Sequence, residues 1–391
     1  MKVQEKADSQ DMLKRPDAAE LKDTGRFYLQ VGYNELFEMG QSAWSGAPYY
    51  PSDSIVTDKD ESIKIIDNNG IVVSSATIQR RNLSSESLGK QVDEITKYLA
   101  TISRDEGIVP RLLWLEPIKP VILAEEVRKK YKYKSDNYLL NPLIGEYDDP
   151  AHQRQCLLTL PISENGNTIV FGSAGSGKTT FLTTMIHSLI NEHTSEEVNL
   201  YVLDFASETL RAFSEAPHVG DVALAHEEEK INNLFRMLHK ECENRKKLFA
   251  DFGGDYSSYI NNSGKTLPSI VLVINNFASF SETYEDLDEE MSYISREGVK
   301  YGIYVVISAS AVNNVRYRLM QNFNQNIVLQ LNDETDYSSI VGRTDGLYPS
   351  KYKGRGLVKT DSLYEFQTAY VTDDSNVYNY LKEFSSCAKK S

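Results

Sequence analysis

Cysteines, long apolar runs and leader features are scarce in this sequence. Its 391 residues include three cysteines, Cys156, Cys242 and Cys387, which are far apart and odd in number, a usage typical of a reducing compartment without a cysteine-based metal site. No apolar run approaches the roughly 18 residues of a membrane helix, and the first residues do not resemble a signal peptide. We therefore expect a soluble, cytosolic chain, although it could be part of a larger membrane protein.

An excess of basic charge is also missing. The chain has 42 Lys and Arg against 56 Asp and Glu, a formal net charge of −14. Contacts with nucleic-acid phosphates need clustered Lys and Arg, so this balance argues against a broad nucleic-acid surface. The length allows two domains, or one domain with connecting pieces.

One stretch, residues 167–180, carries a strong motif. The apolar run 169–171 predicts a buried strand, and it ends at Gly172. Gly177-Lys178-Thr179 follow at the spacing G-x-x-x-x-G-K-[ST], and residues 181–190 are apolar at helical period. Strand, glycine loop and helix in this order are the context that identifies a P-loop.

The residue types in this loop suit a nucleoside triphosphate. Glycines let the backbone turn its N–H groups toward phosphate oxygens, and the new helix adds its positive end. Lys178 is expected to reach the β- and γ-phosphates of ATP, and the Thr179 hydroxyl to bind Mg²⁺. The candidate nucleotide-binding residues are Gly172, Gly175, Ser176, Gly177, Lys178, Thr179 and Thr180.

The chain from about residue 138 alternates between strand-like and helix-like segments. Near-continuous apolar runs at 169–171, 200–204, 270–274, 303–307 and 327–331 predict strands, and helices are expected at 181–190, 227–249, 287–297 and from about 315. Buried runs separated by helices indicate a mostly parallel sheet covered on both faces. We therefore expect an α/β fold of the P-loop NTPase class, with ligands at the carboxyl ends of the strands.

The N-terminal part contains a passage that recurs near the C-terminus. Gly25-Arg26, followed by residues 36–43, resembles Gly354-Arg355 followed by residues 363–369. If the repeat is real, residues 1–50 are the last strands of a preceding ATPase module. Residues 51–137, with strands around an Asn-Asn-Gly turn and helices at 88–102 and 124–132, form a connecting region, and 138–391 form the ATPase domain.

The order of motifs resembles the FtsK/SpoIIIE family of P-loop ATPases, and within it the last ATPase domain of the EssC/EccC motors of type VII secretion. The P-loop carries this resemblance together with residues 203–205, 217–220, 243–249, 271–274, 306–310 and 354–356. The resemblance implies a membrane-anchored motor on the cytoplasmic side, with tandem ATPase modules and a possible hexameric ring. It further implies WXG100-type substrates or their C-terminal signals as partners.

One position departs from a hydrolysing P-loop enzyme. Such an enzyme needs a carboxylate at the end of the strand that faces the P-loop, but here that strand ends in Asn275-Asn276. Asn276 cannot act as a base, and loss of a general base costs about 10²–10⁴ in rate. We therefore expect ATP binding with weak or absent hydrolysis, unless Asp204 or the acidic run at 282–290 substitutes.

Other interpretations stay open at this stage. Ring ATPases borrow an arginine from a neighbouring subunit, and Arg316 and Arg318 could serve, although a plain surface pair is the alternative. The runner-up function is a DNA translocase or packaging ATPase of the same fold, which the acidic charge disfavours. A purely structural module with no nucleotide is the third possibility.

Overall fold

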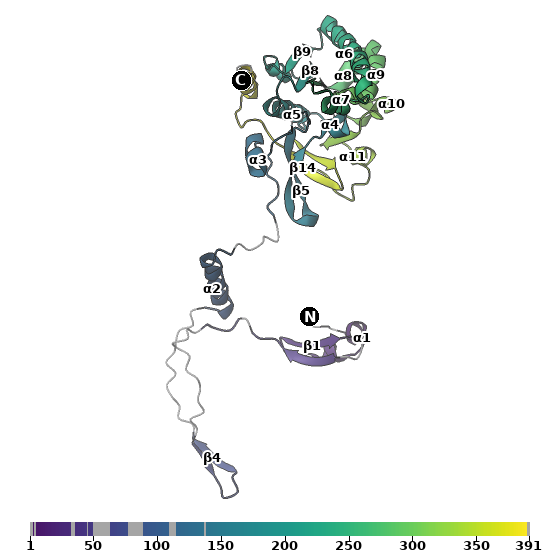
Figure 1. Ribbon diagram of the computed structural model, residues 1–391. Helices are drawn as coiled ribbons and strands as arrows, with labels where there is room; N and C mark the ends of the chain where they lie inside the picture. The colour runs from purple at the N-terminus through teal and green to yellow at the C-terminus, as the bar shows by residue number, and fades with distance from the viewer. Residues whose placement is uncertain are drawn as a thin grey trace. The chain divides into compact units, whose positions relative to one another are not determined.

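The computed structural model describes residues 3, 5–32, 36–44, 46–49, 63–76, 89–108, 115–136 and 138–388 (Figure 1). It divides into two compact units, Met1–Leu112 and Leu113–Ser391. Neither unit contains, within these ranges, a helix long and apolar enough to cross a lipid bilayer.

The first unit consists of small elements. Two antiparallel hairpins are formed by β1 with β2 and by β3 with β4. In the second hairpin, Asp67 Oδ1 accepts hydrogen bonds from the N–H groups of Asn69 (2.8 Å) and Ile71 (2.9 Å), which fixes the predicted turn. The element bounds are α1 Lys6–Leu13, η1 Asp17–Glu20, β1 Arg26–Val31, β2 Leu36–Gln41, β3 Ile63–Ile66, β4 Val72–Ala76 and α2 Gln91–Asp105.

The second unit is built on a ten-stranded sheet in the order β6-β5-β14-β13-β12-β7-β11-β10-β8-β9. Strands β12, β7, β11, β10, β8 and β9 pair in parallel, while β13, β14, β5 and β6 extend the sheet in antiparallel fashion. The predicted mostly parallel α/β sheet is confirmed. The strand bounds are β5 Leu143–Asp149, β6 Arg154–Thr159, β7 Thr168–Phe171, β8 Val198–Asp204, β9 Val219–Leu224, β10 Ser269–Asn275, β11 Ile303–Ala309, β12 Gln325–Leu329, β13 Arg355–Lys359 and β14 Leu363–Thr368.

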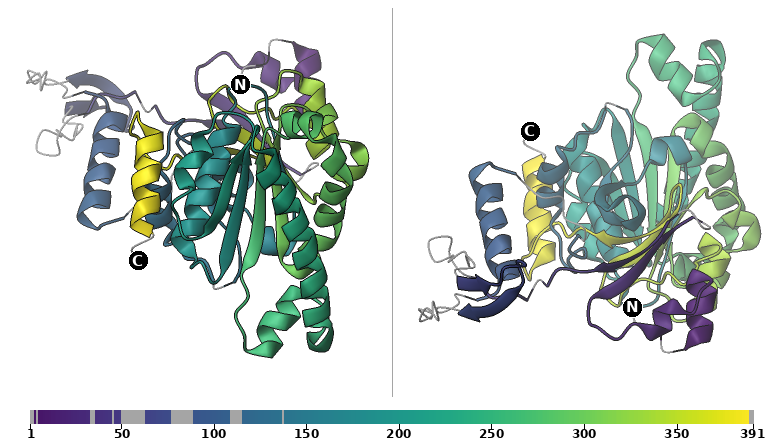
Figure 2. Two further views of the ribbon diagram at one scale, coloured as in Figure 1. Left: turned by 90° about the horizontal axis from the view of Figure 1, so that it is seen from above. Right: turned by 90° about the horizontal axis from the view of Figure 1, so that it is seen from below.

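Helices cover both faces of this sheet (Figure 2). Side chains of β10 alternate between two apolar clusters: Val271 and Val273 face the one that includes α5, whereas Leu272 and Ile274 face the one that includes α6, α8 and α9. Because both faces are buried, the strand needs a continuous apolar sequence. The helices are α3 Ala124–Tyr131, α4 Ile162–Asn165, α5 Lys178–Glu192, α6 Glu228–Phe249, α7 Tyr256–Ser263, α8 Phe277–Thr283, α9 Asp288–Glu297, α10 Tyr317–Met320, α11 Glu334–Val341 and α12 Val377–Ala388, with short 3₁₀ turns η3–η8 between them.

Some elements differ from the sequence prediction. The helix expected from about residue 315 is a single turn, α10. Strand β9 begins within the segment Pro217–Gly220, and its second and third residues are exposed. Such a half-exposed strand lacks the continuous apolar signature by which its neighbours were predicted.

Candidate nucleotide site

The glycine loop lies at the carboxyl edge of the parallel strands. Strand β7 pairs with β11 and β12 on its two sides. Where β7 ends, the Gly172 N–H donates to Ala309 O (3.0 Å) and the Ser173 N–H donates to Gln330 O (2.7 Å). The loop therefore leaves the sheet between the ends of two neighbouring strands, which is where ligands bind in parallel α/β folds.

The geometry favours glycine at each of the three predicted positions. A Cβ on Gly172 would lie 2.4 Å from Ser176 Oγ. Gly177 has a φ of +106°, and a Cβ there would lie 2.6 Å from the backbone nitrogen of Gly354. Gly175 has a φ of +78° in open space. Contact with the Gly354 backbone thus excludes a side chain at Gly177, whereas at Gly175 only the backbone conformation disfavours one.

The polar groups of the loop are poised for an anion. Lys178 Nζ donates to the carbonyl oxygens of Gly172 (2.6 Å) and Ser173 (3.0 Å), and burial lowers the pKa of this ammonium group. Ser176 Oγ is buried and has no hydrogen-bond partner within the described residues. Thr179 lies one residue into α5, half-buried.

These groups fit a nucleotide phosphate. A buried hydroxyl without a partner is costly, and an ammonium group resting on its own loop can transfer to a stronger acceptor. Thr180 is half-buried beside Thr179. Within the described residues, there is no group of three or more His, Cys, Asp or Glu side chains that could hold a metal ion.

Asn275 ends β10 at the same edge of the sheet. Its side chain is buried, with 1% of the residue exposed. Nδ2 donates to Asp204 Oδ1 at 2.9 Å, and Oδ1 accepts from Ser308 Oγ at 3.0 Å. The amide is therefore held from both ends, and each end matches the donor or acceptor it meets.

Asn276 occupies the next turn. Its backbone is left-handed, with φ +68° and ψ +69°, a conformation that asparagine tolerates better than most residues. Its N–H donates to Ser308 Oγ (2.9 Å), and its Nδ2 donates to Phe205 O (3.2 Å). The side chain thus secures the neighbouring loop and offers no group that removes a proton from water.

Asp204 is fully engaged at the end of β8. Its Oδ1 accepts from the N–H groups of Ala206 (3.1 Å) and Ser207 (3.4 Å), and Oδ2 accepts from Leu210 N–H (3.2 Å). With the Asn275 amide added, this buried carboxylate closes the loop after β8. Its hydrogen bonds support the structural role, and not rescue of catalysis.

The other candidates lie on the surface. Arg316 forms an ion pair with Asp288, and 62% of its side chain is exposed. Arg318 is exposed on α10. Glu290, within the acidic run, accepts a hydrogen bond from His239, with 2.7 Å between Oε2 and Nδ1. The structure brings the P-loop and the two asparagines to one edge of the sheet, whereas these charged residues lie on or beside the helices α9 and α10.

Sequence reasoning did not assign roles to Ser308, Gly354 and Arg355. Ser308 bridges both asparagines, and Gly354 N–H donates to Ser176 O of the P-loop at 2.7 Å. Arg355 is buried beside Gly354. The repeated Gly-Arg pair and the family resemblance drew attention to the last two, and the resemblance also included Ser308, but neither gave these residues a role.

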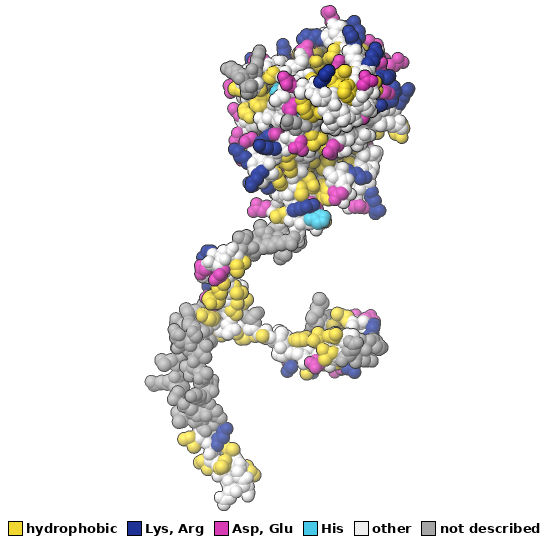
Figure 3. Space-filling model, viewed as in Figure 1, with side chains coloured by type: hydrophobic (Ala, Val, Ile, Leu, Met, Phe, Trp, Pro, Cys, Tyr) yellow, Lys and Arg dark blue, Asp and Glu magenta, His cyan; other side chains and the backbone are white. Residues whose placement is uncertain are grey.

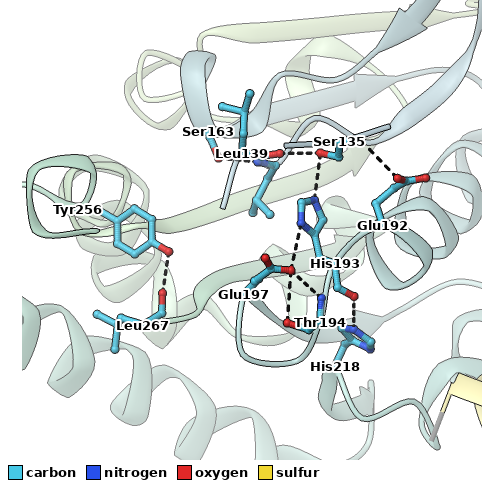
Figure 4. Close-up of polar contacts among 11 residues, drawn as sticks. Ser135, Leu139, Ser163, Glu192, His193, Thr194, Glu197, His218, Tyr256 and Leu267 are labelled. Atoms are coloured by element: carbon cyan, nitrogen blue, oxygen red, sulfur yellow. Dashed lines mark hydrogen bonds and ion pairs between the residues drawn. The ribbon is translucent and has the colours of Figure 1, made fainter. Parts of the chain in front are cut away.

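A cavity lies at the opposite, amino-terminal edge of the parallel strands, and Figure 4 shows three of its lining residues, Leu139, Ser163 and Tyr256. It has a volume of about 430 Å³. On one side Tyr256 donates to Leu267 O at 2.7 Å, and burial raises the pKa of Tyr256 to about 12. The lining residues are Tyr138, Leu139, Ser163, Glu164, Asp255, Tyr256, Ser257, Ile260, Asn261, Val299, Lys300 and Tyr304.

Histidines and a glutamate brace the segment beside this cavity (Figure 4). His193 Nε2 lies 3.3 Å from Ser135 Oγ, and His218 Nε2 lies 2.7 Å from His193 O. Burial lowers the pKa of both imidazoles. His193 also lies 3.8 Å from Glu197 Oε2 through Nδ1, so these side chains link the segments around residues 135, 193 and 218.

Comparison with known proteins places the chain. Residues 146–345 match the FtsK/SpoIIIE family. The chain is 32% identical over 389 residues to the ESX secretion system protein YukB of Bacillus subtilis (strain 168), an alignment that covers 98% of the chain and 25% of YukB. It thus spans about a quarter of the length of such curated relatives.

Solved structures give the same relationship. EssC from Geobacillus thermodenitrificans (ATPases 2 and 3) is 26% identical with a TM-score of 0.64, covering 71% of this chain and 52% of that one. Thermomonospora curvata EccC (ATPases 2 and 3), in complex with a signal sequence peptide, is 27% identical with a TM-score of 0.60, covering 71% and 51%. The family match, the P-loop geometry and the sheet agree, and the chain belongs to the FtsK/SpoIIIE family.

Proposed function

We propose that this chain is a nucleotide-binding module of a type VII secretion motor that holds Mg²⁺·ATP at its P-loop and hydrolyses it slowly. The similarity to YukB, EssC and EccC supports the secretion assignment. The larger motor would be membrane-anchored, with this module on the cytoplasmic side. When bound, ATP would supply the phosphoanhydride bond, and Thr179 would help to hold its Mg²⁺ ion.

The residues of the loop would hold the nucleotide. Lys178 would exchange its loop carbonyls for phosphate oxygens, the Ser176 hydroxyl would gain a partner, and Thr179 would bind Mg²⁺. No residue at the end of β10 would take a proton from water, since the Asn275 amide is fixed between Asp204 and Ser308. That fixed amide is the single observation that supports slow hydrolysis.

Titration of the chain with a fluorescent ATP analogue and Mg²⁺ tests the binding claim. We expect saturable binding that Lys178→Ala weakens about 10- to 100-fold, the value of one or two hydrogen bonds to a charged group. Lys265→Ala, at an exposed lysine, is the matched control. Equal affinity in wild type and Lys178→Ala would refute the proposed site.

We also propose that the cavity at the amino-terminal edge binds the C-terminal signal of a WXG100-type substrate. The EccC structure with a signal peptide supports peptide binding in relatives. The cavity here offers tyrosines for large apolar contacts and Lys300 with Asp255 for polar ones. It lies apart from the P-loop edge, so peptide and nucleotide would not compete.

A labelled substrate C-terminal peptide tests this second site. Ile260→Asp should weaken binding, because it places a charge in the cavity wall. Leu248→Asp, at an apolar residue that is 41% exposed, is the control. Unchanged affinity in Ile260→Asp, or an equal loss in both variants, counts against this placement.

We infer that residues 1–50 close a preceding ATPase module, that 51–137 connect, and that 138–391 form the ATPase domain. Strands β1 and β2 pair in the same geometry as strands β13 and β14. Gln41 Nε2 donates to Thr24 O (3.1 Å) as Gln367 Nε2 donates to Lys353 O (3.0 Å). Arg26 pairs with Gln41 in register as Arg355 pairs with Gln367.

The preceding glycines match as well. Gly25 and Gly354 have φ values of +82° and +79°, and their carbonyls accept the N–H groups of Ser42 (2.9 Å) and Thr368 (2.8 Å). Phe27 opposite Gly40 corresponds to Gly356 opposite Phe366, with the large and small residues exchanged between strands. The repeat therefore extends to individual bonds. The partners of this chain would be neighbouring ATPase modules. In a hexameric ring, Arg316 or Arg318 would reach the nucleotide site of the next module.

The DNA-translocase alternative is disfavoured by charge. The net charge is −14, and acidic and basic side chains are interspersed on the face shown in Figure 3. Tight duplex binding that weakens steeply with salt would favour that alternative instead.

A further inference from the structure

The backbone of Gly354 contacts the P-loop directly. Its N–H donates to Ser176 O at 2.7 Å, and a Cβ added to Gly177 would meet its nitrogen at 2.6 Å. Helix α5 begins at Lys178, the residue after Gly177. A displacement of Gly354 would therefore disturb Ser176 and Gly177, the loop residues that precede helix α5.

The neighbouring residue, Arg355, contacts a different segment. Its Nη2 donates to Ile118 O at 2.7 Å, and its Nε donates to Gln367 Oε1 at 2.9 Å. Gln367 in turn donates through Nε2 to Lys353 O, which fixes the turn before Gly354. The Arg355 side chain is 4% exposed. Water therefore cannot replace its hydrogen bonds to Ile118 or Gln367 if either residue moves.

The segment at residues 117–123, which we call the docked strap, packs against the antiparallel part of the sheet. Ile118 and Ile122 are buried, in a cluster with Leu143 and Ala369. Tyr370 N–H donates to Ile122 O at 2.8 Å, and the Ala124 N–H donates to Tyr370 O at 2.8 Å. The docked strap is thus seated by both apolar burial and backbone bonds.

A second connection joins the same segment to the P-loop helix. The docked strap continues into α3, where Arg128 forms an ion pair with Glu192 at the end of α5. Thr184, within α5, donates to Ala369 O at 2.6 Å. The helix that begins at the P-loop is therefore tied at its far end to α3, and its start is tied to the docked strap through Gly354 and Arg355.

We propose that Arg355 is a positioning residue, which holds the P-loop in its binding conformation by anchoring Gly354 to the docked strap. Strap docking and nucleotide binding then strengthen each other, because a loop fixed in advance loses less conformational freedom when it binds. The strap leads toward the first unit in sequence, so the device would let a neighbouring module alter nucleotide affinity. This inference rests on the proposed nucleotide binding.

Two measurements on the full chain test the proposal. First, Arg355→Gln should weaken binding of the fluorescent ATP analogue about fivefold or more, the lower end of typical coupling between sites. Arg343→Gln is the matched control, because that side chain is 89% exposed and pairs with nearby Asp345. Second, Mg²⁺·ATP should slow amide hydrogen exchange across residues 118–124 in the wild type, and less so in Arg355→Gln.

A variant on the strap side separates positioning from misfolding. Ile118→Asp loosens the strap without touching the P-loop, and it should also weaken nucleotide binding while the melting transition of the sheet stays cooperative. Normal ATP affinity in both folded variants, or strap exchange that ignores nucleotide, would overturn the proposal while leaving the nucleotide site intact. A wild-type chain that binds no ATP would overturn both.

Discussion

Replacing Asn275 with aspartate should destabilise the protein in a pH-dependent way. The amide Nδ2 lies 2.9 Å from Asp204 Oδ1, so Asn275→Asp sets a carboxylate oxygen against a carboxylate oxygen in a site that is 1–2% exposed. Two charges at this distance cannot both persist there, and one group binds a proton instead. The protonated acid can then donate across the same gap and restore the bond.

The size of the effect follows from the cost of that proton. An unperturbed aspartate has a pKa of about 3.9, so protonating it at pH 7 costs about 4 kcal/mol, at 1.36 kcal/mol per pH unit. The pKa in the folded state is raised above its unfolded value. The folded variant therefore binds more protons than the unfolded chain. Its deficit relative to wild type is absent near pH 4 and grows toward about 4 kcal/mol as the pH rises to 7.

Urea unfolding at pH 7.5, 6 and 5 measures this deficit. Asn313→Asp, the same substitution at an exposed position, should change stability little at any of these pH values. Mg²⁺·ATP should stabilise Asn275→Asp more than wild type, since a cation at the strand end offsets the added charge. A deficit that does not vary with pH would show that residue 275 does not face Asp204 as described.

The remaining predictions concern neighbouring groups. Gly177→Ala should abolish ATP-dependent stabilisation in a melting assay, because its Cβ would meet Gly354, whereas Gly175→Ala should cost only about 1 kcal/mol of backbone strain; equal effects would contradict the steric argument. Ser308→Ala should lower stability by about 1–3 kcal/mol, by leaving the buried Asn275 oxygen and Asn276 N–H without their partner, yet keep nucleotide affinity, as an unfolding curve and a titration would show. His187 is 8% exposed, and burial lowers its pKa to about 4, so wild type should lose about 3 kcal/mol relative to His187→Leu as the pH falls from 6.5 to 4; parallel stability curves would refute this.

Much of the fold could be predicted because its central strands are buried on both faces. Runs such as 270–274 and 303–307 admit few other interpretations, and the glycine loop between strand and helix is specific. Half-exposed β9 and the one-turn α10 gave weak or misleading signals. The fold class and the family were therefore accessible, whereas the exact element ends were not.

The partners in the site were harder to predict because they are distant in sequence. Asn275 meets Asp204 across 71 residues and Ser308 across 33, and Arg355 reaches Ile118 across 237. The asparagine pair was visible as a departure from the family pattern. That its amide is held from both sides required the packed strand ends, which sequence spacing does not contain.

A double substitution, Asn275→Asp with Asn276→Glu, would give the end of β10 the acidic side chains that it lacks, but these contacts oppose it. Besides the repulsion at Asp204, glutamate at position 276 must adopt a left-handed backbone, at roughly 1–2 kcal/mol. We still expect higher turnover than wild type when the variant is folded and saturated with Mg²⁺·ATP, at a clear cost in stability.

Single-turnover hydrolysis of γ-labelled ATP by the wild-type chain, at a protein concentration where binding is saturated, tests the central claim most directly. The fixed amide at the end of β10 predicts that bound ATP is cleaved at a rate near the uncatalysed background and is released largely intact. Cleavage at about 1–10³ per second, the usual range of enzymes, would contradict it.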